Sequence, residues 1–157
     1  MFFYIMLLEV YMKKIAIGSD HAGLNYKNKI IELLNNEGYE VHNFGTDSTE
    51  IVDYPNYAHL VCQDITENNA DLGILVCGTG IGMSIAANKH KGIRAGVCGD
   101  TESAKLTRMH NNSNVLCLGE RIIGSELCLA IVKAFLSAEY VGKHHQKRID
   151  MLENFWK

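Results

Sequence analysis

Three short polar clusters in this 157-residue chain combine residue types that can bind and transform a small anionic ligand. Residues 19–23 place an aspartate beside a histidine, and residues 77–82 form a glycine-rich stretch that opens with a cysteine. Residues 108–112 carry a histidine between basic and amide side chains. A thiol, imidazoles, a carboxylate and main-chain amides are the groups that acid–base catalysis and oxyanion binding use.

The glycine-rich stretch, CGTGIG, is neither of the two common nucleotide-binding loops. It lacks the Gly-Lys-Ser/Thr ending of a Walker A motif, and Met83 stands where a dinucleotide fingerprint needs its third glycine. A glycine-rich turn that enters a helix still presents main-chain N–H groups and a positive dipole end. Phosphate, or the oxyanion of an enediolate, would bind there. The alternative is that the glycines only permit close packing of strand and helix.

Cys77 has a different setting from the other cysteines because it precedes this loop and the helix expected after it. A helix N-terminus stabilises a thiolate, which can act as a base or a nucleophile. Cys62, Cys98, Cys117 and Cys128 are predicted to be buried core residues. Five widely spaced cysteines without a C-x-x-C pair predict neither a disulfide framework nor a zinc site, and they favour a reducing, cytoplasmic setting.

The remaining candidates each have a structural alternative. Asp20 could simply cap the helix that follows it, and His110 lies in a polar stretch where solvent exposure is the simpler interpretation. Residues 143–148, KHHQKR, are either an anion clamp or the solvated start of a helix. No metal-ligand cluster is present, so no metal is expected.

Apolar strands and amphipathic helices alternate between these clusters. Predicted strands span residues 13–19, 40–44, 72–77, 93–98 and 115–118, and predicted helices span residues 24–36, 57–69, 83–89, 101–110, 125–137 and about 145–156. Alternation of this kind predicts a three-layer α/β/α sandwich, a Rossmann-like α/β fold around a doubly wound, five-stranded parallel sheet.

The predicted strand order along the chain also indicates where the clusters lie. Parallel sheets bind ligands beyond the carboxyl ends of their strands. Residues 19–23 and 77–82 follow strands, whereas residues 108–112 precede one and belong to the opposite end. A pocket that holds all three clusters would be completed across a dimer interface.

Size and charge exclude several functional classes. A 17.5 kDa chain with 47% apolar and 21% charged residues is predicted to form one folded domain, residues 13–157. Its net charge of −3 indicates no general affinity for nucleic acid or an anionic membrane. The apolar residues 1–12 are too short to span a bilayer and lack the features of a secretory signal. They are predicted to be a start-site extension or added arm, with packing or membrane contact as the alternative.

The clusters occur within longer segments that resemble the B-type ribose-5-phosphate isomerases, in the family that also contains galactose-6-phosphate isomerase subunits. The resemblance runs from about Lys13 to Ile149. It is carried by IAIGSDHAG, DYPNYA, GILVCGTGIGMSIAANK, GIRAGVC, HNNSNVLCLGER and the basic stretch that ends at Arg148.

The resemblance implies a cofactor-free interconversion of D-ribose 5-phosphate and D-ribulose 5-phosphate through a cis-enediolate, within the non-oxidative pentose phosphate pathway. By position, Cys77 matches the proton acceptor, His110 the acid that opens the furanose ring, and Thr79 a hydroxyl that serves the substrate oxygens. The ligand-binding positions that match are Asp20, His21, Gly78, Gly80, Ile81, Gly82, Asn111, Arg121, His144 and Arg148. The family works as homodimers or dimers of dimers with shared active sites.

One position departs from the family pattern, and two other functions remain open. His144 stands where the family usually has an arginine, and a neutral imidazole binds phosphate less well than a guanidinium. The alternative substrate is a hexose 6-phosphate of the galactose or allose type. From another class, a phosphate-binding module without catalysis would bind the same ligands without turnover.

Overall fold

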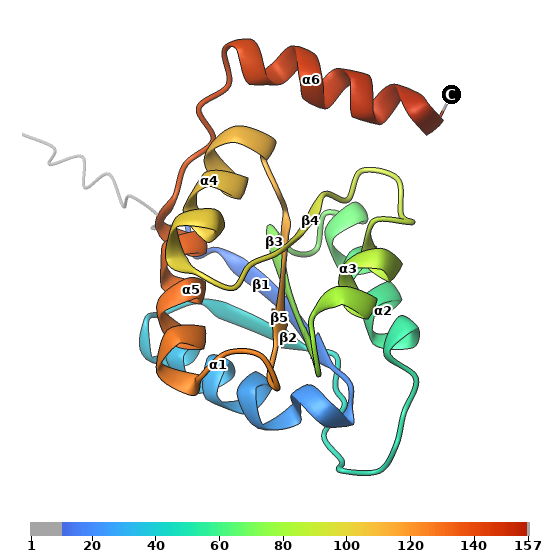
Figure 1. Ribbon diagram of the computed structural model, residues 1–157, viewed down its shortest axis with the longest axis vertical. Helices are drawn as coiled ribbons and strands as arrows, with labels where there is room; N and C mark the ends of the chain where they lie inside the picture. The colour runs from blue at the N-terminus through green and yellow to red at the C-terminus, as the bar shows by residue number, and fades with distance from the viewer. Residues whose placement is uncertain (1–10, 157) are drawn as a thin grey trace, which may run out of the picture.

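The computed structural model describes residues 11–156, which form three layers around a parallel sheet (Figure 1). The strands are β1 (Lys14–Ser19), β2 (Glu40–Asn43), β3 (Leu72–Cys77), β4 (Ala95–Val97) and β5 (Val115–Gly119). They lie in the order β2-β1-β3-β5-β4, and every neighbouring pair is parallel. The predicted doubly wound α/β sandwich is therefore confirmed.

The three central strands are buried along almost their whole length. All six residues of β3 and all five of β5 are buried, because helices cover both faces of the sheet. One face packs against α1 (Leu24–Asn36), α4 (Thr101–Asn111) and α5 (Ser125–Ser137), and the other packs against α2 (Tyr54–Thr66) and α3 (Ile81–Ala87). These two cores leave only the strand ends open for a ligand.

Several element boundaries differ from the sequence prediction for identifiable reasons. Helix α2 begins at Tyr54 rather than residue 57, because Pro55 fits the first turn of a helix, where its missing N–H costs nothing. Helix α3 begins at Ile81, directly after the glycine loop, and not at residue 83. Strand β4 begins at Ala95 rather than residue 93, since the Ile93 N–H donates to the His90 carbonyl and the Arg94 N–H donates to Asn114 Oδ1.

The C-terminal helix α6 (His144–Glu153) stands apart from the sandwich, across the end at which the strands begin (Figure 1). Polar contacts that connect this segment to the body include the Val141 N–H, which donates to the Met109 carbonyl at 3.0 Å, and Arg94, which pairs with Glu153 at 2.7 Å. A 3₁₀ turn, η2 (Asn154–Trp156), replaces the last part of the single helix predicted here.

The predicted N-terminal extension, residues 1–12, lies mostly outside the described residues, which begin at Tyr11. Across residues 11–156, no helix has the length and apolar character needed to cross a membrane.

A histidine clamped between two carboxylates joins β2 to α2 and generates a pH-dependent prediction. His42 Nδ1 lies 2.6 Å from Asp64 Oδ2, and Nε2 lies 2.9 Å from Glu40 Oε1. The hydrogen bonds to Glu40 and then to Asp64 raise the pKa of His42. Protonated His42 therefore stabilises the fold below the unfolded-state pKa of about 6.5, and this stabilisation is lost as pH rises through the higher folded-state pKa.

We expect His42→Gln to destabilise the protein more at about pH 5.5 than at about pH 9, because the contribution of the protonated imidazole falls as pH rises through its raised pKa. Denaturant unfolding of both proteins at the two pH values measures the difference. An equal loss at both would show that the cluster contributes through packing and not through charge.

Candidate active site

The sheet changes its direction of winding between β1 and β3, and the first two polar clusters meet at this point. Ser19 pairs with Val76 in the parallel register of β1 and β3. Asp20 therefore follows the carboxyl end of β1, next to Cys77 at the carboxyl end of β3. The Asp20 N–H donates to the Val76 carbonyl at 3.2 Å and extends the sheet pairing into the loop. A crevice at such a switch point is the usual ligand site of an open α/β sheet.

Asp20 is 7% exposed and holds the start of the short 3₁₀ turn η1 (His21–Gly23). Its Oδ1 accepts hydrogen bonds from the N–H groups of Ala22 at 2.9 Å and Gly23 at 3.1 Å. The capping role is therefore present. Its Oδ2 accepts no hydrogen bond from the described residues, which leaves one carboxylate oxygen for a ligand.

Cys77 ends β3 with its side chain 5% exposed and enclosed by its own loop. The Gly80 N–H donates to Cys77 Sγ at 3.1 Å. This contact requires Gly80 at φ +79°, and a Cβ there would lie 3.0 Å from the backbone of Leu118. Glycine is needed at this position, since a side chain would meet both strain and a close neighbour.

The other four cysteines lie in the two cores, where they were predicted. Burial raises the pKa of Cys62 and of Cys128 to about 12, and it also raises the pKa of Cys98 and Cys117. These thiols therefore stay protonated at neutral pH. Cys77 differs from them because its sulfur accepts a main-chain N–H and because it lies at the carboxyl end of β3.

The amides of the glycine loop divide into satisfied and free groups. Gly80 N–H is used by Cys77 Sγ, and Ile81 N–H donates to Thr79 Oγ1 at 3.2 Å. Within residues 11–156, no acceptor receives the N–H of Gly78 or Thr79. Two unsatisfied N–H groups beside a sulfur atom are suited to bind an oxyanion.

The side chains of Arg121 and Tyr54 both lie against the glycine loop. Arg121 N–H donates to the Gly78 carbonyl at 2.9 Å, and its guanidinium passes 3.2 Å from the point where a Gly78 Cβ would lie. The Tyr54 ring lies against Gly82 with 2.8 Å to the corresponding point. Tyr54 was not among the predicted site residues, although its segment, DYPNYA, was recognised.

Two further residues near β1 were not predicted. The Ser19 hydroxyl is fully buried at the strand end and has no hydrogen-bond partner within residues 11–156. Lys27, on α1, is fully buried as well, with its amine bonded to the segment after β2. His21 Nδ1 lies 3.3 Å from the N–H of Val52 in that segment.

The third cluster lies at the other end of the sheet, as the sequence indicated for a single chain. His110 and Asn111 end α4 just before β5, whereas Arg121 follows β5. The five residues of β5 span about 13 Å, and α6, with His144 and Arg148, lies on the His110 side (Figure 1). One chain therefore contains two separate groups of candidate site residues, called half-sites below, that do not meet.

The far half-site contains a stack of imidazoles. His110 and His145 lie parallel with ring centroids 4.5 Å apart, and His144 lies 4.0 Å from His145. Burial, then the neighbouring His144, His110 and Arg148, lower the pKa of His145. His145 was predicted only as a member of the basic stretch, residues 143–148, and not as an individual site residue. A concentration of N–H donors and positive charge is suited to bind a phosphate.

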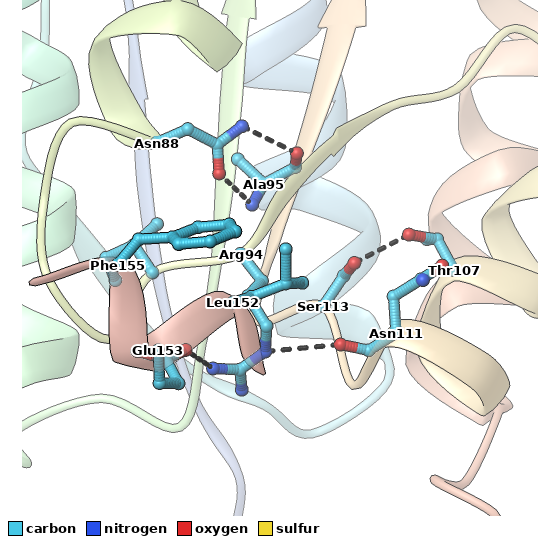
Figure 2. Close-up of a pocket in the computed structure, with 10 residues that line it drawn as sticks. Asn88, Arg94, Ala95, Thr107, Asn111, Ser113, Leu152, Glu153 and Phe155 are labelled. Carbon is cyan, nitrogen blue, oxygen red and sulfur yellow. Dashed lines mark hydrogen bonds and ion pairs between the residues drawn. The ribbon is translucent and has the colours of Figure 1, made fainter. Parts of the chain in front are cut away.

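Asn111 also lines a cavity of about 470 Å³ between α4, β4 and the C-terminal segment (Figure 2). Arg94 crosses its floor, with Nη1 on Glu153 and Nε within reach of the Asn111 carbonyl at 3.2 Å. Phe155 closes one side. Because the guanidinium is already paired with a carboxylate, the described residues that line this cavity provide no free cation to hold an anion.

In the part of the chain that the structure describes, no group of three or more His, Cys, Asp and Glu side chains is arranged to hold a metal ion.

Comparisons with known proteins give one consistent result for the chain as a whole. A ribose/galactose isomerase family model matches residues 15–152. Ribose-5-phosphate isomerase B of Escherichia coli is 50% identical over 141 residues, which cover 90% of this chain and 95% of the relative. The crystal structure of a ribose 5-phosphate isomerase from Thermotoga maritima is 50% identical, with a TM-score of 0.90, and the match covers 92% of this chain and 99% of that one.

A third relative was solved with a ligand. The structure of ribose-5-phosphate isomerase B from Mycoplasma genitalium contains bound ribulose-5-phosphate, and it matches with a TM-score of 0.90 at 40% identity over 93% of this chain and 98% of that one. A family model over most of the chain, relatives at half identity and a common fold lead to one conclusion: this chain belongs to the ribose/galactose isomerase family.

Proposed function

We propose that this chain interconverts D-ribose 5-phosphate and D-ribulose 5-phosphate. The observation that carries the proposal is the group at the β1–β3 switch point: the Cys77 sulfur, the free amides of Gly78 and Thr79, and the open oxygen of Asp20. A base beside an oxyanion site is what proton transfer next to a carbonyl requires. The ribulose-5-phosphate bound to the Mycoplasma genitalium relative supports the choice of substrate.

The reaction moves one hydrogen from C2 to C1 and one hydroxyl hydrogen from O2 to O1. In the proposed mechanism the Cys77 thiolate removes the C2 proton, and the electron pair moves onto the aldehyde oxygen to form the enediolate. The N–H groups of Gly78 and Thr79 stabilise this oxyanion, with a contribution of roughly 3–4 kcal/mol per well-placed donor. The Thr79 hydroxyl accepts the O2 hydrogen and donates its own hydrogen to O1, and the Cys77 thiol returns its proton to C1, which completes the ketose.

The aldose substrate is mostly a closed furanose, so its ring must open before the proton transfer. His110 is the proposed acid for this step, because an imidazole can donate a proton to the ring oxygen near neutral pH. Arg121, Arg148 and His144 are the proposed phosphate partners. Two of these, Arg148 and His144, lie in the half-site of His110.

We further propose a homodimer, alone or as a dimer of dimers, in which one chain's Cys77 half-site meets the partner's His110 half-site. The separation of the two halves along the sheet supports this arrangement. Exposed apolar side chains near both halves support it too: Ile81 and Ile85 on α3, and Met151 and Leu152 on α6. Such side chains mark surfaces that a partner covers. Five buried free thiols fit a cytoplasmic location.

The first test compares ribulose 5-phosphate formation by the wild-type protein and Cys77→Ala, with ribose 5-phosphate as substrate and a chelator present. We expect turnover by the wild-type protein and a turnover about 10²–10⁴-fold lower in Cys77→Ala, because a positioned base contributes about that much to the rate. Cys98→Ala is the matched control, since it removes a buried thiol away from the loop and should keep wild-type turnover. No turnover by folded wild-type protein would redirect the assignment to a hexose 6-phosphate, and then to a non-catalytic phosphate-binding module.

The shared site predicts complementation between two inactive variants. Cys77→Ala and His110→Ala, unfolded together and refolded as a mixture, should recover about a quarter of wild-type activity, because half of the dimers are mixed and one of their two sites is intact. Cys77→Ala mixed with Asp20→Ala is the matched control. Both changes lie in the same half-site, so no intact site can form. Equal activity of the two mixtures would contradict the shared site.

His144 provides a separate prediction about phosphate affinity. His144→Arg should lower KM for ribose 5-phosphate and leave kcat close to wild type, because a guanidinium binds phosphate through two parallel hydrogen bonds. Steady-state kinetics at fixed ionic strength measure both constants. A raised or unchanged KM would remove this position from the phosphate site.

A further inference from the structure

Lys27 is a fully buried lysine near the proposed active site, and the isomerase mechanism does not use it. Its side chain is 0% exposed, and its amine donates to Asp47 Oδ1 at 2.7 Å and to Asn43 Oδ1 at 3.0 Å. A charge in a buried position costs free energy unless it is paired and hydrogen-bonded, whereas an apolar side chain would avoid this cost. The two bonds therefore indicate what the lysine is for: it holds Asn43 and Asp47.

Asn43, Lys27 and Asp47 form a closed set of contacts, which we call the Lys27 clamp. Asn43 Nδ2 donates to Asp47 Oδ1 at 3.1 Å, and Asn43 Oδ1 also accepts the Gly45 N–H at 3.0 Å. The Lys27 hydrogen bond, then that of Asn43, lower the pKa of Asp47, so its carboxylate is ionised at neutral pH. The clamp thus fixes the start of the segment that leads from β2 to α2.

Further hydrogen bonds carry this order along the segment toward the active site. The Thr46 N–H donates to the Ser19 carbonyl at 2.7 Å, directly beside Asp20. The Ser48 N–H donates to Thr46 Oγ1 at 3.2 Å, and the Glu50 N–H donates to Ser48 Oγ at 3.1 Å. The N–H groups of Ser48 and Glu50 are therefore each held by the side chain two residues earlier. This series ends two residues before Val52.

Val52 is a second point at which the segment meets the proposed active site. Its N–H lies 3.3 Å from His21 Nδ1. Because a main-chain N–H can only donate, Nδ1 must accept, and the proton of the neutral ring is then on Nε2. No group within residues 11–156 bonds Nε2, so this N–H is available to a ligand.

We infer that the Lys27 clamp is a positioning device, which holds Val52 so that His21 is kept as the Nε2–H tautomer and donates to a substrate oxygen. The inference rests on the proposed isomerase function for the identity of the ligand. The ligand-binding role of His21 is the one that the family resemblance implies, and the inference adds that Nε2 donates to the ligand and does not act as a base. Lys27 acts only through the segment and does not touch the substrate.

The tautomer can be tested without turnover. In substrate-free protein labelled with ¹⁵N-histidine, the His21 resonances should report an unprotonated Nδ1 and a protonated Nε2. In Lys27→Met, which replaces the amine with an apolar chain of similar length, the two tautomers should become mixed. His21→Gln identifies the resonances.

The kinetic test uses two substitutions in the exposed part of the segment. Asp47→Ala removes the clamp's carboxylate, and Glu50→Ala removes a carboxylate that makes no side-chain contact among the described residues. We expect Asp47→Ala and Lys27→Met to raise KM for ribose 5-phosphate about fivefold to tenfold with kcat within about twofold, the effect of one weakened ligand hydrogen bond. Glu50→Ala should leave both constants unchanged.

Three results would overturn the inference. One is a wild-type His21 with its proton on Nδ1, and another is an unchanged tautomer and KM in both Lys27→Met and Asp47→Ala. The third is an equal rise of KM in Glu50→Ala, which would indicate a general effect of loop charge. Because the tautomer is read without substrate, an absence of isomerase activity would refute the proposed function and leave this measurement interpretable.

Discussion

The parallel pairing of β1 with β3 is the constraint on which the rest of the structure depends. It brings Asp20 beside the end of β3, where the loop after Cys77 folds back and donates an N–H to the sulfur. Because the chain winds in opposite directions on the two sides of this pair, α1 and α3 leave it on opposite faces. The strand ends are left open between them, and close packing elsewhere keeps the loop glycines in conformations that side chains would not permit.

The same topology accounts for the division of the site. A residue that precedes a strand and a residue that follows the same strand lie about a strand length apart. β5 separates His110 from Arg121 in this way, so no adjustment of loops within one chain can bring the imidazole stack to Cys77. The proposed assembly with a second copy would combine them, and a closed two-fold pair would create two equivalent sites at once.

The fold and much of the site could be predicted because they follow from local patterns. The apolar run of β3 is typical of a strand buried on both faces, and the glycine-rich loop after Cys77 is typical of a tight turn that enters a helix. Tyr54 and Lys27 escaped prediction, since their roles depend on contacts with residues distant in the chain. A lysine in an amphipathic helix is normally assigned to the solvated face, and nothing in the neighbouring sequence indicates that Asn43 and Asp47 will cover it.

Lys27 also shows how stability and function can be carried by one arrangement. The segment after β2 contains few apolar side chains that could bind it to either core, so hydrogen bonds and one ion pair hold it in place. An apolar residue in place of Lys27 would pack at lower electrostatic cost, but it would leave the segment without directional contacts. Directional contacts matter here because, in the proposed arrangement, the segment determines which nitrogen of His21 faces the ligand. A shift of the Val52 N–H by about an ångström would break its bond to Nδ1, and the ring could then adopt either tautomer.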